Sequence, residues 1–553
     1  MPTLLIKQAS IIDGTGAKAY DGHLLVDGAF IQDILSPHDD LPEAETVMDA
    51  QGQVLCPGFI DMHAHADWTL ALPEHSSLLA CLVEQGVTTV VGGNCGFSPA
   101  PAPLPQHMRQ QKKEASLFTG REWPIAWQSI GDFLDVVAQK EPLVNLAQLV
   151  GHGSIRMAAS ENGKGALPAE ELAACQRVLK DALDQGACGL SFGLGYEPGM
   201  YVPDAELDAF CRTAAKAQKP VTVHMKAYSR ISPAYPLATL EAHNRKALRE
   251  TLDMARRTGV ALQISHFIFV GRNSWNSAQQ ALKMVDDARA EGVDVMIDAF
   301  PYTAGNTLID VLLPTWFLKT LPDGFSNPWL LARLRLELEI GFRLVGFAYP
   351  DFQILDAAVP GWEHLNGMTL DQVACKWKCS PFNTLVRLSR ESGGEATMLF
   401  HAYSGEPTNE DALDAVLAHP ACLFETDAII KGRGLPNPSA LGTFPKILGE
   451  YCRERRLLDL ADAICRMTGA SARRFGLSDR GTIAPGKAAD LVIFDADTIN
   501  EAVSAAGAER PSGIREVFIN GRQVVSDGIY GENIRCGQVL KMGKRRSCLS
   551  SKR

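Results

Sequence analysis

The sequence lacks the features that mark membrane-spanning, exported and nucleic-acid-binding proteins. No apolar run among its 553 residues approaches the length needed to cross a bilayer, and "MPTLLIKQAS" has no basic leader before an apolar core. Positive charge is in deficit, since 53 basic and 64 acidic residues give a formal net charge of −11. Nothing in that balance favours nucleic acid as a partner. We therefore expect a cytoplasmic protein that acts on a small molecule.

A compact disulfide framework is also missing. The 13 cysteines are odd in number and spread through a long chain, which fits reduced thiols better than disulfides. Hydrophobic residues make up 46% and charged residues 21%, a composition typical of globular proteins with a large core. The length predicts one large domain and at least one smaller one. The sequence carries no signal for an oligomeric state.

Short alternating strands with turn signals occur at both ends of the chain. Residues 1–54 include "LLIKQASIIDGTG" and "GHLLVDGAFIQDIL", and residues 479–535 include "KAADLVIFDADTI" and "REVFINGRQVVSDG". We predict that the two blocks pair into one small β-sandwich domain. The remaining residues, 536–553, are predicted to be a basic tail.

The middle of the chain alternates β-rich and helical stretches, which is the pattern of βα units and a parallel sheet. Eight stretches are expected to be strands: "GFIDMHAH", "VTTVVGGNC", "VNLAQLVGHG", "ACGLSFGLG", "PVTVHMK", "ALQISHF", "DVMIDAFPY" and "ACLFETDA". They predict an α/β fold with a (β/α)8 TIM-type barrel over residues 55–478. The gap before the eighth strand is too long for one helix and predicts an inserted subdomain at about 311–395. "ATMLFHAYSG" is an extra strand or part of that insertion.

Polar side chains gather at the predicted carboxyl ends of the strands, where a β/α barrel builds its active site. His63 and His65 in "HAH" share one face of an extended strand, because side chains alternate with period two. His224, His266 and Asp427 end the fifth, sixth and eighth strands. Imidazoles, a carboxylate and the Cys95 thiol are ligands typical of zinc and related ions. A single histidine would be weak evidence, and His152 in "LVGHGSIR" is better explained by packing.

The motifs resemble those of a known family. "PGFIDMHAHAD" is similar to the first-strand motif of the amidohydrolase superfamily. "GGNCGFSPAP", "GLSFGLGYEPGMY", "DAFPYTAGNT" and "LGTFPKILGEY" resemble the N-acyl-D-amino-acid deacylase, or D-aminoacylase, family. This resemblance spans nearly the whole chain. It implies a metal-dependent hydrolase of linear amides, a small-molecule substrate and no membrane or nucleic-acid partner.

The resemblance also assigns the metal ligands. Many superfamily members bridge two metals with a modified lysine on strand four, but "CGLSFGLGY" contains no lysine. In the D-aminoacylase family a strand-two cysteine fills that place, and Cys95 matches it. The resemblance implies one tightly held Zn2+ on Cys95, His224 and His266. It implies a weaker second site on His63, His65, the shared Cys95 and Asp427.

Within this mechanism Asp427 is the expected catalytic residue, taking a proton from the attacking water and passing it to the leaving nitrogen. The expected substrate-binding residues are Tyr196, Tyr302, Lys226 and Arg433. Either tyrosine is equally well explained as a core aromatic. The cations Lys226, Arg230, Lys431 and Arg433 are also explained as ordinary solvated charges.

The chain departs from the family pattern where the substrate carboxylate should be held. The family places a lysine two residues after the strand-six histidine and an arginine three residues before "GTFP", where this chain has Ile268 and Ser439. Asn306 replaces a serine in "AGNT". Either other cations bind the carboxylate, or the substrate is neutral at that end.

These departures leave alternatives open. The same barrel could serve a cyclic amidase or lactonase whose substrate has no free carboxylate. A non-catalytic binding protein is a third alternative, but it predicts eroded ligands, and none is eroded. The segment "LPTWFLKTLPDGFSNPW" in the insertion is explained equally well as a lid and as ordinary packing.

Overall fold

Eight parallel strands form the centre of the structure, a computed structural model that describes residues 1–121, 125–161, 165–236, 241–501, 503–504, 507–508 and 510–542. The strands pair in the order of the chain and include all eight predicted ones. They are β6 (Phe59–Asp61), β7 (Val87–Gly92), β8 (Asn145–Gly151), β9 (Gly189–Gly193), β10 (Val221–His224), β11 (Leu262–Ile264), β12 (Val295–Ala299) and β16 (Cys422–Phe424).

The sheet is closed where its first and last strands meet. Ala64 and Ala428 form a parallel bridge. Next to it, the Asp427 amide donates to the His63 carbonyl at 2.9 Å, and the His65 amide donates to the Ala428 carbonyl at 2.9 Å. The predicted (β/α)8 barrel is therefore confirmed, and its closure aligns the "HAH" segment with Asp427.

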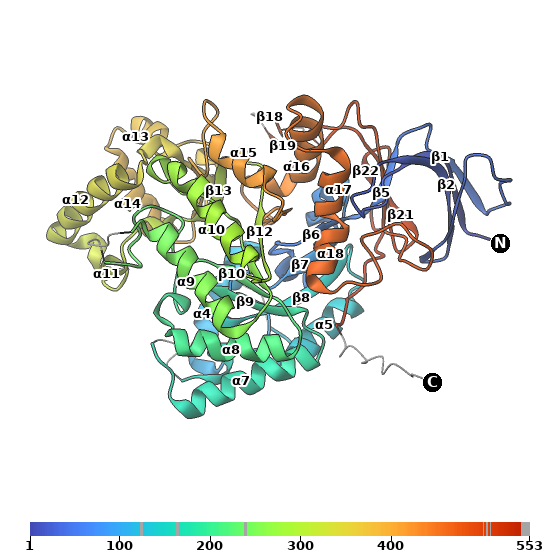
Figure 1. The fold of residues 1–553 in the computed structure, drawn as a ribbon. Helices are drawn as coiled ribbons and strands as arrows, with labels where there is room; N and C mark the ends of the chain where they lie inside the picture. The colour runs from blue at the N-terminus through green and yellow to red at the C-terminus, as the bar shows by residue number, and fades with distance from the viewer. Residues whose placement is uncertain are drawn as a thin grey trace.

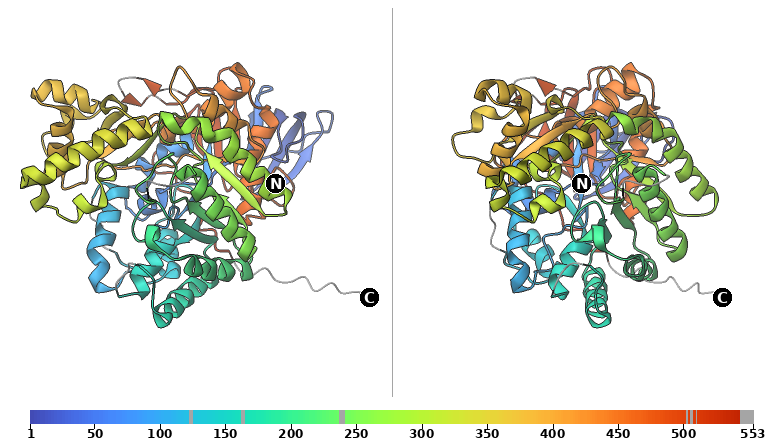
Figure 2. Two further views of the ribbon diagram at one scale, coloured as in Figure 1. Left: turned by 60° about the vertical axis from the view of Figure 1, so that its left-hand side comes forward. Right: turned by 90° about the vertical axis from the view of Figure 1, so that its left-hand side faces the viewer.

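Helices surround the barrel (Figures 1 and 2). A long one, α9 (His243–Thr258), buries Ala247, Leu248, Thr251 and Leu252 on one face, the spacing expected of an amphipathic helix packed on a sheet. The others are α1 (Ala66–Leu70), α2 (His75–Leu78), α3 (Ala80–Glu84), α4 (Met108–Thr119), α5 (Ile130–Gln139), α6 (His152–Ala159), α7 (Ala169–Asp184), α8 (Asp204–Lys216), α10 (Ala278–Ala290), α15 (Asp411–Ala418), α16 (Ser439–Lys446), α17 (Leu460–Met467) and α18 (Gly469–Phe475). A π-helical segment, Ile447–Glu454, continues α16.

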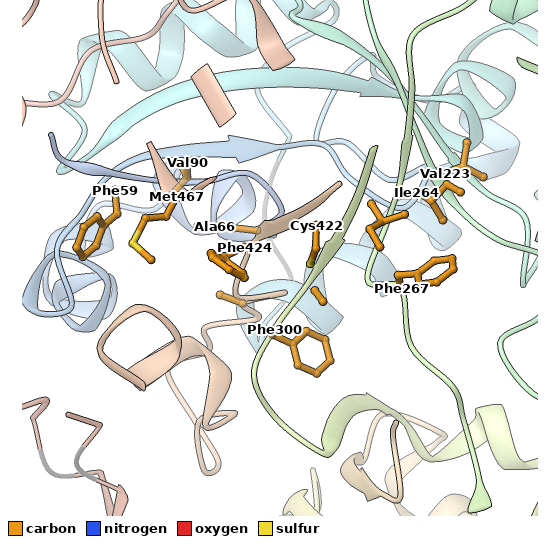
Figure 3. Close-up of a cluster of buried hydrophobic side chains, with 14 of the residues drawn as sticks. Phe59, Ala66, Val90, Val223, Ile264, Phe267, Phe300, Cys422, Phe424 and Met467 are labelled. Atoms are coloured by element: carbon orange, nitrogen blue, oxygen red, sulfur yellow. The ribbon is translucent and has the colours of Figure 1, made fainter. Parts of the chain in front are cut away.

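The two faces of the barrel strands pack into different clusters. Phe59, Val90 and Phe424 belong to the large cluster shared with the surrounding helices, where Met467 packs beside them (Figure 3). Their chain neighbours Ile60, Val91 and Leu423 belong to a smaller cluster. Because both faces are apolar and buried, these strands read as continuous hydrophobic runs in the sequence.

Between β12 and β16 the chain forms a separate layer with its own apolar core. Three strands pair in the order β13 (Ala304–Leu308), β15 (Thr397–His401), β14 (Phe352–Asp356), so "ATMLFHAYSG" contains an extra strand. Four helices accompany them: α11 (Thr315–Leu318), α12 (Pro328–Val345), α13 (Leu370–Trp377) and α14 (Pro381–Ser392). This layer lies on the side of the barrel opposite the N-terminal strands (Figures 1 and 2).

Strands from both ends of the chain join in one nine-stranded sheet, as the sequence predicts. Its central pairing is between β5 (Val54–Pro57), from the first block, and β17 (Leu491–Phe494), from the second. The other members are β1 (Leu4–Ile11), β2 (Tyr20–Asp27), β3 (Phe30–Leu35), β4 (Thr46–Asp49), β20 (Ile514–Ile519), β21 (Arg522–Ser526) and β22 (Ile529–Tyr530). Two short strands, β18 (Val503–Ser504) and β19 (Gly507–Ala508), pair with each other.

The start of the predicted basic tail runs along the barrel. The Leu146 amide on β8 donates to the Gln538 carbonyl, and the Leu540 amide donates to the Leu146 carbonyl. Residues 543–553 of that tail lie outside the described residues. Within the described part of the chain, every helix is too short or too polar to cross a membrane.

Candidate metal centre

A sharp turn after β7 carries Cys95. Gly93 and Gly96 on either side have φ of +78° and +76°, a region that residues with side chains rarely adopt. A Cβ on Gly93 would lie 2.2 Å from the Leu149 carbonyl oxygen, and one on Gly96 would lie 2.6 Å from the Gly193 amide. The turn therefore requires glycine at both positions, and it places the Cys95 thiol at the mouth of the barrel.

Cys95, His224 and His266 form one group of metal-ligating atoms. The Cys95 Sγ lies 3.5 Å from His266 Nε2 and 3.8 Å from His224 Nδ1, and the two nitrogens are 2.9 Å apart. Tetrahedral zinc with Zn–N and Zn–S bonds of about 2.1 and 2.3 Å separates a nitrogen from a sulfur by about 3.6 Å. The sulfur-to-nitrogen distances match this value. The two nitrogens lie closer than the about 3.4 Å that the same geometry gives, so the group fits a zinc ion once the two rings separate slightly.

A second group shares the same thiol. Cys95 Sγ lies 3.3 Å from His63 Nε2, and His65 completes a cluster whose donor atoms lie within 4.8 Å of one another. Asp427 Oδ1 is 3.5 Å from both His63 Nε2 and His65 Nε2. The six residues expected to bind metal are thus brought together, with Cys95 between the two groups.

Three of these residues have unusual backbone conformations. Cys95, His266 and Asp427 have φ of +56°, +31° and +47°. Such values are uncommon for residues other than glycine, and they gather at functional sites, where the surrounding structure holds them in place. The rest of the barrel therefore supplies the stability that keeps these donors at its mouth.

Charges within the cluster shift its protonation equilibria. Burial alone would raise the pKa of the Cys95 thiol, but the positive charges of His63 and His266 hold it well below its ordinary value. Burial would lower the pKa of His63, yet the Cys95 charge and the contact with Asp298 raise it well above the ordinary value. Burial would also raise the pKa of Asp427, but His65, His63 and His266 outweigh burial and lower that pKa below its ordinary value. The cluster therefore favours a thiolate and a carboxylate, the forms that bind metal, while His63 has to lose its proton before its ring nitrogen can bind an ion.

Several residues without an assigned role in the sequence analysis support the ligands. Asp298 at the end of β12 is fully buried; it accepts hydrogen bonds at 2.7 Å from the His266 amide and from Gln263 Nε2, and its Oδ1 is 3.5 Å from His63 Nδ1. The Ser191 hydroxyl donates to the Gly93 carbonyl and accepts from the Gly96 amide, bracing the cysteine turn. Asp298 lies near the carboxyl end of one predicted strand and Ser191 lies within another, and these positions were the available signal.

Aromatic rings enclose the histidines. The Tyr228 ring packs 5.0 Å from the rings of both His224 and His266, and its hydroxyl donates to the Ser265 carbonyl. Phe118 from α4 stacks on His65 with ring centroids 4.6 Å apart. Neither residue stands in a motif whose spacing reveals it, because α4 lies in the loop after β7 and Tyr228 in the loop after β10.

The four expected substrate-binding residues lie in different surroundings. The Tyr196 hydroxyl donates to the Cys95 carbonyl at 2.6 Å, and its ring lies 4.9 Å from that of His224, so Tyr196 adjoins the cluster. The other three have partners elsewhere. The Tyr302 hydroxyl donates to Glu501 at 2.6 Å, and Lys226 Nζ lies 5.2 Å from the Tyr235 ring centroid. Arg433 pairs with Asp356 at 3.0 Å and with Glu395 at 3.5 Å. Only Tyr196 has a described contact with a candidate ligand.

The positions where the family pattern places substrate anchors are apolar or neutral. Ile268 and Ser439 are both buried. The Ser439 hydroxyl and the Asn306 side-chain oxygen have no hydrogen-bond partner among the described residues. Lys431 is half-buried, and desolvation lowers its pKa to about 8. His152 lies apart from the cluster, with Nε2 3.0 Å from Glu206 Oε1 and its ring between Phe192 and Phe210.

Known proteins resemble this chain over nearly its whole length. The amidohydrolase family matches residues 46–311 and 405–525. The N-acyl-D-glutamate deacylase of Alcaligenes xylosoxydans xylosoxydans is 32% identical over 94% of this chain and 92% of its own, and the D-aminoacylase of the same organism is 30% identical over 94% of each. The crystal structure of N-acyl-D-glutamate deacylase from Bordetella bronchiseptica, complexed with zinc and a phosphonate inhibitor, is 30% identical with a TM-score of 0.79, covering 98% of this chain and 100% of that one.

Proposed function

The chain belongs to the amidohydrolase family, and we propose that it is a zinc-dependent hydrolase that removes the acyl group from an N-acyl-D-amino acid or a close analogue. The observation that carries the proposal is a thiol, four imidazoles and a carboxylate converging at the mouth of the barrel. The named activities of the relatives support the substrate class.

We propose that Cys95, His224 and His266 hold the tightly bound zinc. The sulfur-to-nitrogen distances and the burial of the thiol fit an ion bound by one thiolate and two imidazoles. His63, His65, Asp427 and the shared Cys95 are proposed to hold a second, weaker divalent ion. Zinc bound here would supply a Lewis acid and a water of lowered pKa.

Two residues of the chain have proposed roles beside the metal: Asp427 transfers protons, and Tyr196 supports the Cys95 turn. Asp427 is the only carboxylate among the six proposed ligands. It can accept a proton from water and return it to a leaving nitrogen. Its side chain is part-exposed while His63 and His65 are buried, so the carboxylate is the group that faces an incoming substrate. The Tyr196 hydroxyl holds the Cys95 carbonyl and keeps the thiol turn in place.

A second function is favoured by one observation. Ile268 and Ser439 are buried, uncharged residues at the positions where the family pattern has a lysine and an arginine. A substrate carboxylate at that end would lack its fixed cationic partner. A cyclic amidase or lactonase that acts on a neutral ring is therefore the alternative function for the same ligands.

The test is amine release by the zinc-loaded protein from N-acetyl-D-amino acids, their L enantiomers and the matching carboxamides. We expect hydrolysis of the D acids, whose carboxylate would have to be held by cations such as Lys226 or Lys431. A preference for the carboxamides or for cyclic amides, with zinc bound, would contradict an acyl amino acid as substrate and support the alternative.

We propose that the protein acts in the cytoplasm on a small molecule, without nucleic acid. All twelve described cysteines are free, which suits a reducing compartment. The net charge of −11 supports the absence of a nucleic-acid partner.

A further inference from the structure

The inserted layer exposes a stripe of large apolar side chains along α12. Trp329 is 86% exposed, Leu336 60%, Ile340 49% and Leu344 40%. Scattered apolar residues on a surface need no explanation, but several on one side of a helix are typical of an interaction site. Arg333 lies on the same side, between Trp329 and Leu336. Helix α12 itself lies at the outer edge of the molecule (Figures 1 and 2).

The spacing of the stripe is that of a helix–helix contact. Residues 329, 336, 340 and 344 are seven, four and four apart and therefore fall on one side of a helix with 3.6 residues per turn. The opposite side is already used, since Leu334, Leu338 and Phe342 are buried in the core of the insertion. The helix is thus apolar on two faces, and among the described residues only one of these faces is buried against other parts of the chain.

The helix is well formed without any partner on its outer face. The Asn327 side chain accepts from the Trp329 and Leu330 amides, Pro328 occupies the first turn, and Gly346 ends the helix in a left-handed conformation. These are favourable caps at both ends. The exposed stripe is therefore a stable feature of the surface, 18 residues or about 27 Å long.

The charges beside the stripe are neutralised within the helix. Arg333 pairs with Glu337 at 2.8 Å, and Arg335 pairs with Glu339 at 2.8 Å. The first guanidinium also lies 4.0 Å from the centroid of the Trp316 ring. Because each side of the stripe carries both signs, a surface with the same pattern meets no net repulsion there.

The two ends of the helix carry unpaired charges of opposite sign. Arg343 lies in its last turn, and Asp323 lies in the short 3-10 turn Asp323–Ser326 that precedes the helix. Both are exposed, and neither forms an ion pair with another residue of the described chain. In an antiparallel pair of α12 helices, Arg343 of one copy would come beside Trp329 and Asp323 of the other. This arrangement offers a cation–π contact and a charge pair at each end.

We infer that α12 is a two-fold interface, where the chain pairs with a second copy of itself through antiparallel α12 helices centred on Leu336. A two-fold interface requires one patch that complements itself, and the apolar row, the balanced sides and the opposite ends meet that requirement. The proposal goes beyond the hydrolase function, and the metal centre plays no part in it. One helix pair gives an interface at the small end of the usual range, so the dimer should be weak, with a Kd on the order of micromolar.

The first experiment is sedimentation velocity on the purified full-length protein from about 1 to about 100 μM. We expect the wild type to pass from monomer to dimer over this range, and the double variant L336E/I340E to remain monomeric throughout. V47E, at an exposed apolar residue on β4, is the matched control and should dimerise like the wild type. Thermal melts of all three proteins should agree, because each substituted side chain is exposed.

A second experiment locates the two-fold axis. In the proposed arrangement the Leu336 side chains of the two copies meet, so L336C should form a disulfide-linked dimer under mild oxidation, and V47C should not. Cys375 is exposed in the wild type, so crosslinking is measured relative to the wild-type protein. A wild type that stays monomeric at the highest concentration overturns the inference. So does a dimer that L336E/I340E leaves intact.

Discussion

Replacing Asp298 by asparagine removes a buried charge that contacts both groups of candidate ligands. The carboxylate accepts from the His266 amide and from Gln263 Nε2, each at 2.7 Å, and its Oδ1 is 3.5 Å from His63 Nδ1. A carboxylate at Nδ1 favours the tautomer whose proton sits on that nitrogen. When an ion displaces the proton from the other nitrogen, His63 Nε2, the ring is held with that nitrogen toward the metal site.

The size of the effect follows from these contacts. An asparagine amide has one accepting oxygen, so in D298N its NH2 group must face a donor at a position where the carboxylate accepts. Losing a hydrogen bond to a charged group costs about 1.5 to about 3 kcal/mol. Outer-shell substitutions of this kind typically lower metal affinity by about 10-fold to about 100-fold. We expect D298N to fold and to lose zinc affinity within that range, with amide hydrolysis falling in parallel at limiting zinc.

The assay is zinc competition against a fluorescent chelator, followed by activity measurements with and without excess zinc. D294N is the matched control, because Asp294 lies just before the same strand but is exposed and pairs with Arg474 at 2.7 Å. It should bind zinc like the wild type. If D298N also binds zinc with wild-type affinity, Asp298 does not orient the ligands and the reasoning fails.

Three further predictions concern single side chains. C95S should lose at least about 100-fold in zinc affinity, because a hydroxyl is not deprotonated as a thiol is, and the cobalt-loaded variant should lack a thiolate charge-transfer band; a retained band would contradict Cys95 as ligand. Y196F removes the 2.6 Å bond to the Cys95 carbonyl and should lower the free energy of unfolding by about 1 kcal/mol, measured by urea titration; unchanged stability would show that the turn does not need it. Burial raises the pKa of Glu114 from 4.5 to about 8, so the folded state holds a proton that the unfolded chain releases, and stability is lost as the pH rises from about 4.5 through about 8. E114Q should match the wild type near pH 4 and exceed it by up to about 5 kcal/mol near pH 9; parallel pH profiles would contradict this.

The barrel was predictable from the sequence because its strands are buried on both faces. Stretches such as "VTTVVGGNC" and "ALQISHF" read as short apolar runs that end in a chemically active residue, and all eight lie in one sheet. Joining the two terminal blocks was also predictable, because both show the same pattern of short alternating strands with turn signals. The partners within that sheet were not, because the pairing of Val492 on β17 with Cys56 on β5 joins residues far apart in the chain.

The metal ligands were predictable from the sequence, but the residues that hold those ligands in place were not. Ligands are chemically distinctive and stand at strand ends, so the motifs locate them. Asp298 and Ser191 also lie in barrel strands, but a carboxylate and a hydroxyl in such strands have many uses. Only the fold shows that one contacts His63 and the other the cysteine turn. The partners of Tyr302 and Arg433 were also not predictable. Tyr302 contacts Glu501 and Arg433 contacts Asp356, and each partner comes from a distant segment of the chain.

The arrangement of the ligands explains why the chemistry is easier to infer than the substrate. Cys95, His266 and Asp427 hold left-handed backbone conformations that the sheet imposes, through bonds such as that from the Asp427 amide to the His63 carbonyl. Those constraints come from the backbone of the barrel itself and not from residues that would contact the substrate. Ile268 and Ser439 are under no such constraint, and exchanging a charged residue for a neutral one there leaves the donors where they are. The same barrel can therefore keep its reaction while its substrate changes.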